Sequence, residues 1–120
     1  MNILALDVGG TAIKSALIRE GQLLKSNECV SEAKLGGPQL IKNIMNTIDS
    51  YSNYDVIGIS TTGQVDAKKG CIVYANDNVP NYTGTKLRKI IKDKYQKPVY
   101  IENDVNAAAL GEAYYGAGKG

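Results

Sequence analysis

The chain has 120 residues, with 14 lysines and arginines against 12 aspartates and glutamates, and therefore a net charge of +2. Both signs of charge are scattered along the chain, which argues against nucleic acid or a membrane surface as its partner. A chain of this length suits a single domain with one hydrophobic core.

The start of the chain and its cysteines predict a soluble, cytoplasmic protein. Asp7 interrupts the first apolar run well before the length of a membrane helix, and no basic segment precedes that run. Cys29 and Cys71 lie far apart, and the chain has no histidine that could complete a metal site with them. We expect both cysteines to be buried free thiols.

The first thirty residues alternate between apolar and polar side chains in a way that predicts three strands. Residues Ile3–Val8 form a short apolar run, and the segment TAIKSALIREG after them alternates with a period of two. Gly9 and Gly10 lie where a hairpin turn belongs, since glycine accepts a positive φ without steric cost. With QLLKSNECV as a third strand, the opening is predicted to be an antiparallel meander.

A helix and a strand are predicted next. Pro38 suits the first turn of a helix. The apolar residues after it recur at spacings of one, three and four, namely Leu40, Ile41, Ile44, Met45, Ile48 and Tyr51. The segment Asp55–Ile59 follows as a strand. A helix between two strands predicts a parallel crossover connection.

The remainder contains a long irregular segment, then a helix, a strand and another helix. Residues 64–84 include one short strand, around Cys71–Tyr74, and ordered loops of this length are often functional. An apolar stripe from Leu87 to Tyr95 predicts a second helix, which Pro98 ends. The strand VYI and the small-residue helix VNAAALGEAYY complete an α/β order of βββαβ, loop, αβα.

The turn DVGGTAIK is a candidate phosphate site, although the residues alone leave a plain hairpin turn equally open. Its glycines and lysine fit neither the Gly-x-Gly-x-x-Gly nor the P-loop spacing, and both of those loops open a helix. The amides of Gly9 and Gly10 and the hydroxyl of Thr11 can bind phosphate oxygens. Lys14 adds positive charge, and Asp7 is a candidate for holding Mg²⁺ through water.

Two further segments follow predicted strands, where open α/β sheets place their ligands. One is the turn STTGQVD, which contains Gly63. In the other, ENDVNAAALGE, Asn103 or Asp104 is a natural N-cap of the next helix. The alternative role is catalytic: Asp104 would take a proton from a substrate hydroxyl that attacks a phosphoryl group, and Asn103 would orient neighbouring hydroxyls of a polyol.

Four segments in this order and spacing, ALDVGGTAIK, IGISTTGQVD, NVPNYTG and IENDVNAAALGEAYYGAG, resemble the ROK family of sugar kinases and sugar-responsive repressors. The resemblance implies the actin-like, ribonuclease-H-like ATPase fold, in which two similar lobes close on ATP and a sugar. This chain looks like the first lobe, a single domain over residues 1–120 whose mixed sheet joins an antiparallel meander to parallel strands. The implied reaction is transfer of the γ-phosphoryl group of Mg-ATP to a sugar hydroxyl.

On the matching positions, the resemblance implies a role for each motif. The positions that match the ATP phosphate motif are Asp7, Gly9, Gly10, Thr11 and Lys14, with Asp7 also expected to hold Mg²⁺ through water. Asp104 matches the catalytic base. The positions expected on the sugar side are Gly63, Gln64, Asn76, Asn78, Asn103 and Asp104. Which of Asn76 and Asn78 reaches a sugar hydroxyl stays open.

The sequence departs from the family pattern in two ways. Thr62 stands where many members have proline, and NVPNY replaces the commoner NLPGW, which predicts a sugar-side loop shaped for a different ligand. The family's second phosphate motif, its remaining sugar ligands, its cysteine-rich zinc motif and its adenosine pocket would all lie after Gly120. We therefore expect a truncated lobe that does not turn over ATP alone, and a full-length kinase that is a homodimer.

Two other functions compete with the kinase. A repressor of the same family normally carries a helix-turn-helix ahead of the first strand, and a strand that starts at Asn2 leaves no room for it. A free-standing binding module is the other alternative, in which Asp104 is only a cap and the glycine turns are only turns. The ATP-dependent sugar kinase is the function that the motifs favour.

Overall fold

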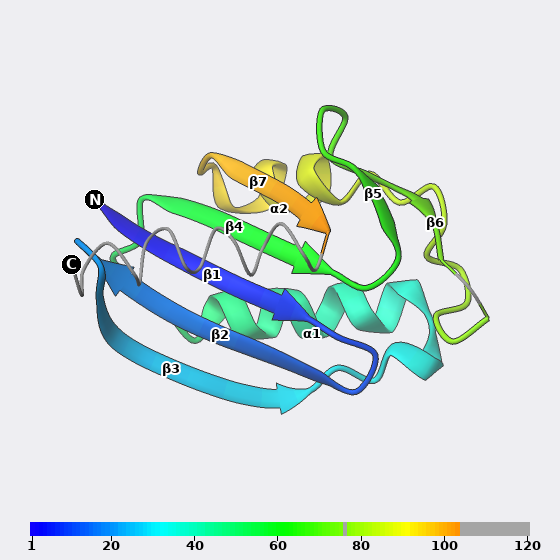
Figure 1. Cartoon of the computed structure of the whole chain (residues 1–120), viewed down its shortest axis with the longest axis horizontal. Helices are drawn as coiled ribbons and strands as arrows, with labels where there is room; N and C mark the ends of the chain where they lie inside the picture. The colour runs from blue at the N-terminus through cyan, green and yellow to red at the C-terminus, as the bar shows by residue number, and fades with distance from the viewer. Residues whose placement is uncertain (76, 104–120) are drawn as a thin grey trace.

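The first thirty residues form the three antiparallel strands that their alternation predicts. In the computed structural model, which describes residues 1–75 and 77–103, these strands are β1 (Asn2–Val8), β2 (Ala12–Arg19) and β3 (Gln22–Val30). β1 pairs with β2 and β2 with β3, both antiparallel, with one register shift between Leu17 and Ile18. The predicted meander is confirmed (Figure 1).

Two parallel strands extend the meander on the β1 side. The short helix η1 (Ala33–Leu35) and helix α1 (Gly37–Asp49) lead to β4 (Val56–Thr61), which pairs with β1 in parallel. β7 (Val99–Asn103) pairs with β4 in parallel, so the five-stranded sheet has the order β3-β2-β1-β4-β7. The prediction of a helix in a parallel crossover is therefore confirmed.

The segment between β4 and the second helix contains more regular structure than its sequence predicts. β5 (Gln64–Asp66) and β6 (Cys71–Tyr74) pair as a separate two-stranded sheet, and α2 (Leu87–Tyr95) follows them. The sequence predicts β6 and α2 but not β5, because three residues are too few to show a period. The helix expected after β7 lies outside the described residues.

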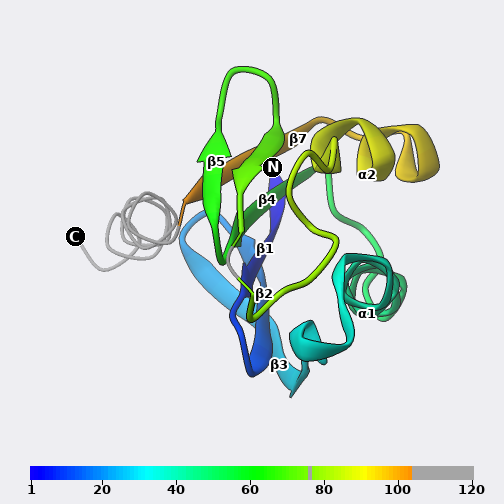
Figure 2. The ribbon, with the colours of Figure 1, turned by 90° about the vertical axis from the view of Figure 1, so that its right-hand side faces the viewer.

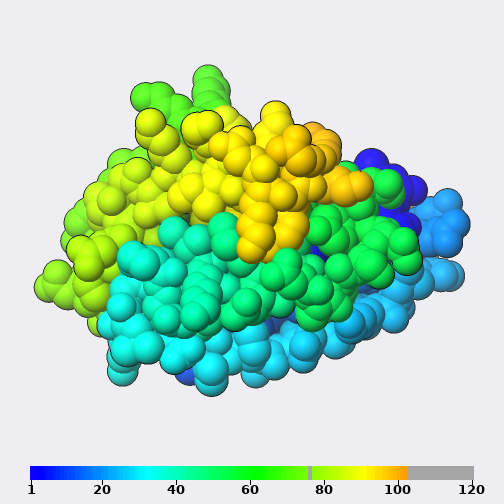
Figure 3. Space-filling view, turned by 180° about the vertical axis from the view of Figure 1, so that it is seen from behind, coloured from blue at the N-terminus to red at the C-terminus, as the bar shows by residue number. Residues whose placement is uncertain are grey.

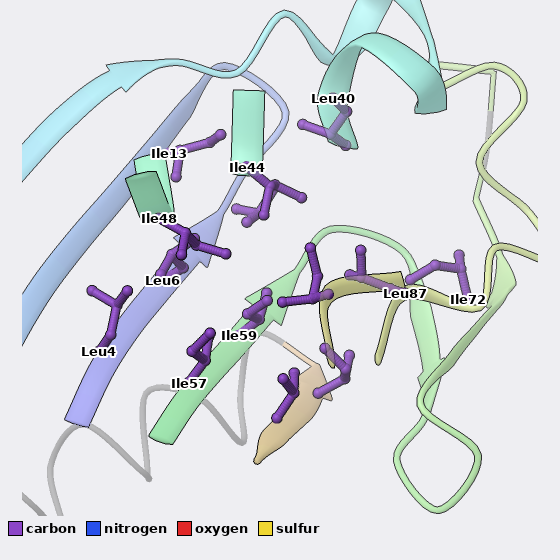
Figure 4. Close-up of a cluster of buried hydrophobic side chains, with 14 of the residues drawn as sticks. Leu4, Leu6, Ile13, Leu40, Ile44, Ile48, Ile57, Ile59, Ile72 and Leu87 are labelled. Atoms are coloured by element: carbon purple, nitrogen blue, oxygen red, sulfur yellow. The ribbon is translucent and has the colours of Figure 1, made fainter. Parts of the chain in front are cut away.

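Helices α1 and α2 lie on one face of the five-stranded sheet, where they cover the hydrophobic core (Figures 2 and 3). α1 buries Leu40, Ile44 and Ile48, one residue in each turn, as its apolar stripe predicts. Figure 4 shows these side chains meeting those of the strands, among them Leu4, Leu6, Ile13, Ile57 and Ile59. In the described part of the chain, no helix has the length and apolar character needed to cross a membrane.

The loop between β6 and α2 is held against both α1 and the sheet. At the start of α1, the amide of Gly37 donates a hydrogen bond to the carbonyl oxygen of Pro80, 2.7 Å away. Tyr82 is fully buried, and its hydroxyl oxygen lies 2.8 Å from Oγ1 of Thr61 at the end of β4. Burial raises the pKa of Tyr82 from its ordinary value of 10.0 to about 12, against a smaller opposing effect of the hydrogen bond to Thr61.

The prediction that both cysteines are buried is wrong. Cys29 lies on β3, the edge strand of the sheet, and all nine residues of that strand are exposed. Cys71 is partly exposed at the start of β6. An edge strand has a neighbouring strand on one side only, so its side chains lie at the rim of the core and not within it. Both thiols are free, as expected.

Replacing Gly37 with alanine is expected to destabilise the fold. A Cβ atom at this position would lie 2.9 Å from the carbonyl carbon of Asn81 and 3.1 Å from Cα of Tyr82, and backbone atoms cannot turn aside as a side chain can. We expect Gly37→Ala to lower the free energy of unfolding by about 1–3 kcal/mol, the usual cost of overpacking. Urea unfolding followed by circular dichroism measures this change.

The matched control is Gly10→Ala, because a Cβ atom at Gly10 would meet nothing within 4 Å. This variant should unfold within about 0.5 kcal/mol of the wild type. Equal stability of the two variants would show that the loop around Asn81 is not held against α1 as described.

Tyr82→Phe is expected to change how stability depends on pH. Between pH 10 and 12, Tyr82 ionises in the unfolded chain but stays protonated in the folded chain, so the wild type loses about 1.4 kcal/mol per pH unit through this group. Tyr54 and Tyr95 also have raised pKa values, but they contribute equally to both proteins. The difference between the two proteins therefore isolates Tyr82.

At pH 8 the wild type should be more stable than Tyr82→Phe by about 1 kcal/mol, the usual contribution of one hydrogen bond. This advantage should disappear and then reverse as the pH rises from 10 to 12. Chemical unfolding at a series of pH values measures it. A difference that stays constant over that range would contradict the buried, hydrogen-bonded hydroxyl.

Candidate functional site

The carboxyl ends of the three parallel strands lie side by side at one edge of the sheet. Val8 at the end of β1 is in register with Thr61 at the end of β4, and Thr61 is in register with Asn103 at the end of β7. The turn of residues 9–11 and the turn that begins at residue 62 therefore leave two neighbouring strand ends (Figure 1). Open α/β sheets bind their ligands at this edge.

The turn of residues 9–11 leaves its backbone open to a ligand at Gly10, whereas the amide of Gly9 is already bonded. The amide of Gly9 donates a hydrogen bond to the carbonyl oxygen of Ala12 at 2.8 Å, and a Cβ atom at Gly9 would lie 3.2 Å from the same oxygen. The sequence predicts that these two glycines are needed because the turn requires a positive φ. This prediction is wrong, since neither Gly9 nor Gly10 has a positive φ. At Gly10 neither conformation nor packing excludes a side chain. Because Gly10 has no side chain, the space beside this exposed stretch of backbone is clear.

Thr11 in this turn and Lys14 just after it are both exposed. Lys14 on β2 is in register with Asp7 on β1 and with Glu28 on β3, so three charged residues lie in one row across the sheet. Within residues 1–75 and 77–103, however, Lys14 forms no ion pair with either neighbour; the ion pair found there joins Lys89 and Asp93. The ammonium group of Lys14 is therefore available to an anion.

The carboxylate of Asp7 is held from the neighbouring parallel strand. Ser60 on β4 is in register with Asp7, and its Oγ donates a hydrogen bond to Oδ1 of Asp7 at 3.0 Å. Ser60 is only 1% exposed, whereas Asp7 is exposed. A buried hydroxyl thus holds one carboxylate oxygen of an exposed aspartate.

The turn after β4 is held next to the turn after β1. The amide of Thr62 donates a hydrogen bond to the carbonyl oxygen of Val8 at 2.8 Å. Gly63 has a φ of 94°, and a Cβ atom there would lie 2.9 Å from the carbonyl oxygen of Tyr74, so conformation and packing both require glycine. Gln64 follows as an exposed residue at the start of β5.

Asn78 is exposed in the loop that Tyr82 anchors. The next residue, Val79, is buried. Earlier in the loop, the amide of Ala75 donates a hydrogen bond to Oγ1 of Thr83 at 2.9 Å. These contacts hold the loop at Ala75 and at Val79.

Three of the predicted site positions are not placed by the structure. Asn76 and Asp104 lie outside the described residues, and Asn103 is described only as the last backbone position of β7. Asp7, Gly9, Gly10, Thr11 and Lys14 are brought together around the β1–β2 turn, while Gly63, Gln64 and Asn78 lie after β4 and β6. Within the described ranges, no three acidic or cysteine side chains form a metal cluster.

Two residues near Asp7 were missed by reasoning from the sequence. Ser60 bonds to the Asp7 carboxylate, and Glu102 on β7 is in register with Ser60. Glu28, Lys14, Asp7, Ser60 and Glu102 thus form one polar row across all five strands. The available signal was the pair of hydroxyl residues, Ser60 and Thr61, that ends the otherwise apolar buried strand VIGIST. The partner of Ser60 could not be named without the register between β1 and β4.

The fold and the order of these turns can be compared with known proteins. The family model described as ROK family matches residues 3–120. An uncharacterised protein of Clostridium perfringens is 46% identical over 119 residues, which cover 96% of this chain and 40% of that protein. The glucokinase of Thermotoga maritima is 32% identical over 124 residues, which cover 100% of this chain and 39% of the enzyme.

Solved structures agree with this relationship. A ROK family glucokinase from Streptomyces griseus, solved in complex with glucose and AMPPNP, matches with a TM-score of 0.83 and 26% identity. The match covers 100% of this chain and 38% of that one. The chain therefore spans about two fifths of the length of its relatives. It has the fold of the actin-like ROK sugar kinases, as the resemblance implies. The chain belongs to the ROK family.

Proposed function

We propose that this chain is the first of the two lobes of a sugar kinase, which transfers the γ-phosphoryl group of Mg-ATP to a sugar hydroxyl. One observation carries the proposal: the ends of β1, β4 and β7 are in register, so the glycine turn, the Gly63 turn and the chain entering Asp104 leave one edge of the sheet together. The sugar kinases among the relatives support it, because the matched segment spans these turns.

The β1–β2 turn is the proposed contact for the phosphates of ATP. The amides near Gly10 are open to solvent, and no side chain blocks the approach of phosphate oxygens. Thr11 adds a hydroxyl donor, and Lys14, which forms no ion pair within the described part of the chain, adds positive charge. Phosphoryl transfer depends mostly on positioning and on neutralising charge, and these groups can supply both.

Asp7 is the proposed contact for Mg²⁺, through a water molecule. Its exposed carboxylate is an oxygen donor of the kind that this cation prefers, and a single carboxylate is enough where phosphates and water supply the other ligands. The residues present therefore fit the ion. When bound, Mg²⁺ would neutralise charge on the phosphates, and Asp7 would hold its water shell beside the glycine turn.

The sugar is proposed to bind between the β4 and β7 ends. Gly63, Gln64, Asn103 and one of Asn76 or Asn78 would face its hydroxyls, and Asp104 would accept the proton of the attacking hydroxyl. β7 is separated from β1 by two strand spacings, about 10 Å. That distance between the strand ends leaves room for a phosphoryl group and a sugar hydroxyl side by side.

A chimeric enzyme tests this proposal. Residues 1–120 would replace the matched segment of the Thermotoga maritima glucokinase, which makes up 39% of that enzyme, and the rest of the enzyme would be kept. We expect the chimera to release ADP with at least one sugar from a panel of glucose, a β-glucoside, N-acetylglucosamine and N-acetylmannosamine. A chimera that unfolds cooperatively on heating, yet phosphorylates none of these sugars, would contradict the proposed function.

In the active chimera, Asp104→Asn should lower kcat by about 10²–10⁴-fold, the range typical of general-base catalysis, while the KM for sugar changes little. Asp93→Asn is the matched control, because Asp93 lies on the exposed face of α2 and pairs with Lys89. This variant should keep the unsubstituted rate. If Asp104→Asn also kept it, Asp104 would not be the base.

A further inference from the structure

Ser60 is a buried hydroxyl whose side-chain partner is the exposed carboxylate of Asp7. Its Oγ lies 3.0 Å from Oδ1 of Asp7, and the parallel pairing of β1 with β4 places the two residues directly side by side. Ser60 is 1% exposed, so it cannot exchange this bond for one to bulk water without moving β4. The donor is therefore rigid, and the acceptor lies at the rim of the proposed nucleotide site.

We propose that Ser60 is a positioning residue, which holds the Asp7 carboxylate in the one orientation that suits the water shell of a magnesium-nucleotide complex. This inference rests on the proposed function and assigns Ser60 a part in it. In this arrangement the serine holds Oδ1 of Asp7, and Oδ2 is left for the water shell. Ser60 itself does not touch the nucleotide.

The physical reason is the freedom of an exposed aspartate. An unrestrained carboxylate samples several rotamers, and a ligand that needs one of them must supply the free energy that selects it. A hydrogen bond to a charged group is strong enough to select one rotamer in advance. Lys14, the other neighbour of Asp7 in the row, forms no ion pair in the described residues and so does not perform this task.

The alternative is that the hydrogen bond to Asp7 only stabilises the fold, by giving the buried hydroxyl of Ser60 a partner. Ser15 provides the comparison, because it is also a buried serine of the sheet and also has a side-chain partner, the hydroxyl of Tyr51 at 2.8 Å. Ser15 is in register with Leu6, on the core side of β1, and not with Asp7. Ser15→Ala and Ser60→Ala thus remove similar buried hydroxyls, and only the second removes a contact to Asp7.

The first measurement uses the 120-residue chain and needs no catalysis. Three-bond NMR couplings across Cα–Cβ of Asp7 report how its χ1 rotamers are populated. We expect one dominant rotamer in the wild type and in Ser15→Ala, and averaged couplings in Ser60→Ala. The amide spectrum shows whether each variant is folded. Ser60→Cys, of similar size but a weaker donor, serves instead if the alanine variant does not fold.

The second measurement uses the chimeric kinase with the same substitutions. Ser60→Ala should raise the Mg²⁺ concentration needed for half-maximal rate by about tenfold, which corresponds to about 1.4 kcal/mol, while the KM for sugar stays the same. Ser15→Ala should leave both values as in the unsubstituted chimera. A loss that was only structural would change both serine variants alike.

The outcomes separate this inference from the function beneath it. If Ser60→Ala keeps a single Asp7 rotamer, or keeps the normal Mg²⁺ requirement, Ser60 is not a positioning residue although the kinase function stands. If the folded, unsubstituted chimera is inactive with every sugar, the proposed function fails first and the inference falls with it. Averaged couplings together with the raised Mg²⁺ requirement support the inference.

Discussion

The parallel pairing of β4 between β1 and β7 is the constraint on which the rest of this structure depends. Register in a parallel ladder is specified when one face of the strands is buried, since a slip of one residue would turn that face outward. Here Leu6 and Ile59 point into the core beneath α1 and α2 (Figure 4). The next residue of each strand, Asp7 on β1 and Ser60 on β4, is thereby placed on the opposite face, and the two lie side by side. Core packing thus positions the polar groups of the site.

The same logic explains why the loops of the site are well defined. The loop before α2 is tied to the start of α1 through Gly37 and Pro80 and to the end of β4 through Tyr82 and Thr61. A loop held at both places orders its exposed side chains at little further entropic cost when a ligand binds. The turn at Gly10 differs from this loop, because it has no side chain to order and its backbone is accessible to a ligand.

Much of the fold could be predicted from the residues alone, because its signals are local. The alternation around Ala16 predicts a strand, and the stripe through Ile44 predicts a helix, whatever the rest of the chain does. The position of Cys29 could not be predicted in this way. Alternation predicts that a strand exists. How deeply that strand is buried depends on whether it lies in the middle or at the edge of the sheet.

The sequence by itself determined the family, the order of the longer elements and the motifs that could contact phosphate and sugar, since each of these is a pattern along the chain. Only the tertiary structure decided which side chains of different strands act together. Ser60 and Asp7 are 53 positions apart, and no periodicity links them. Their hydrogen bond exists because two strands pair in one register, and that register is chosen by the packing of the whole core.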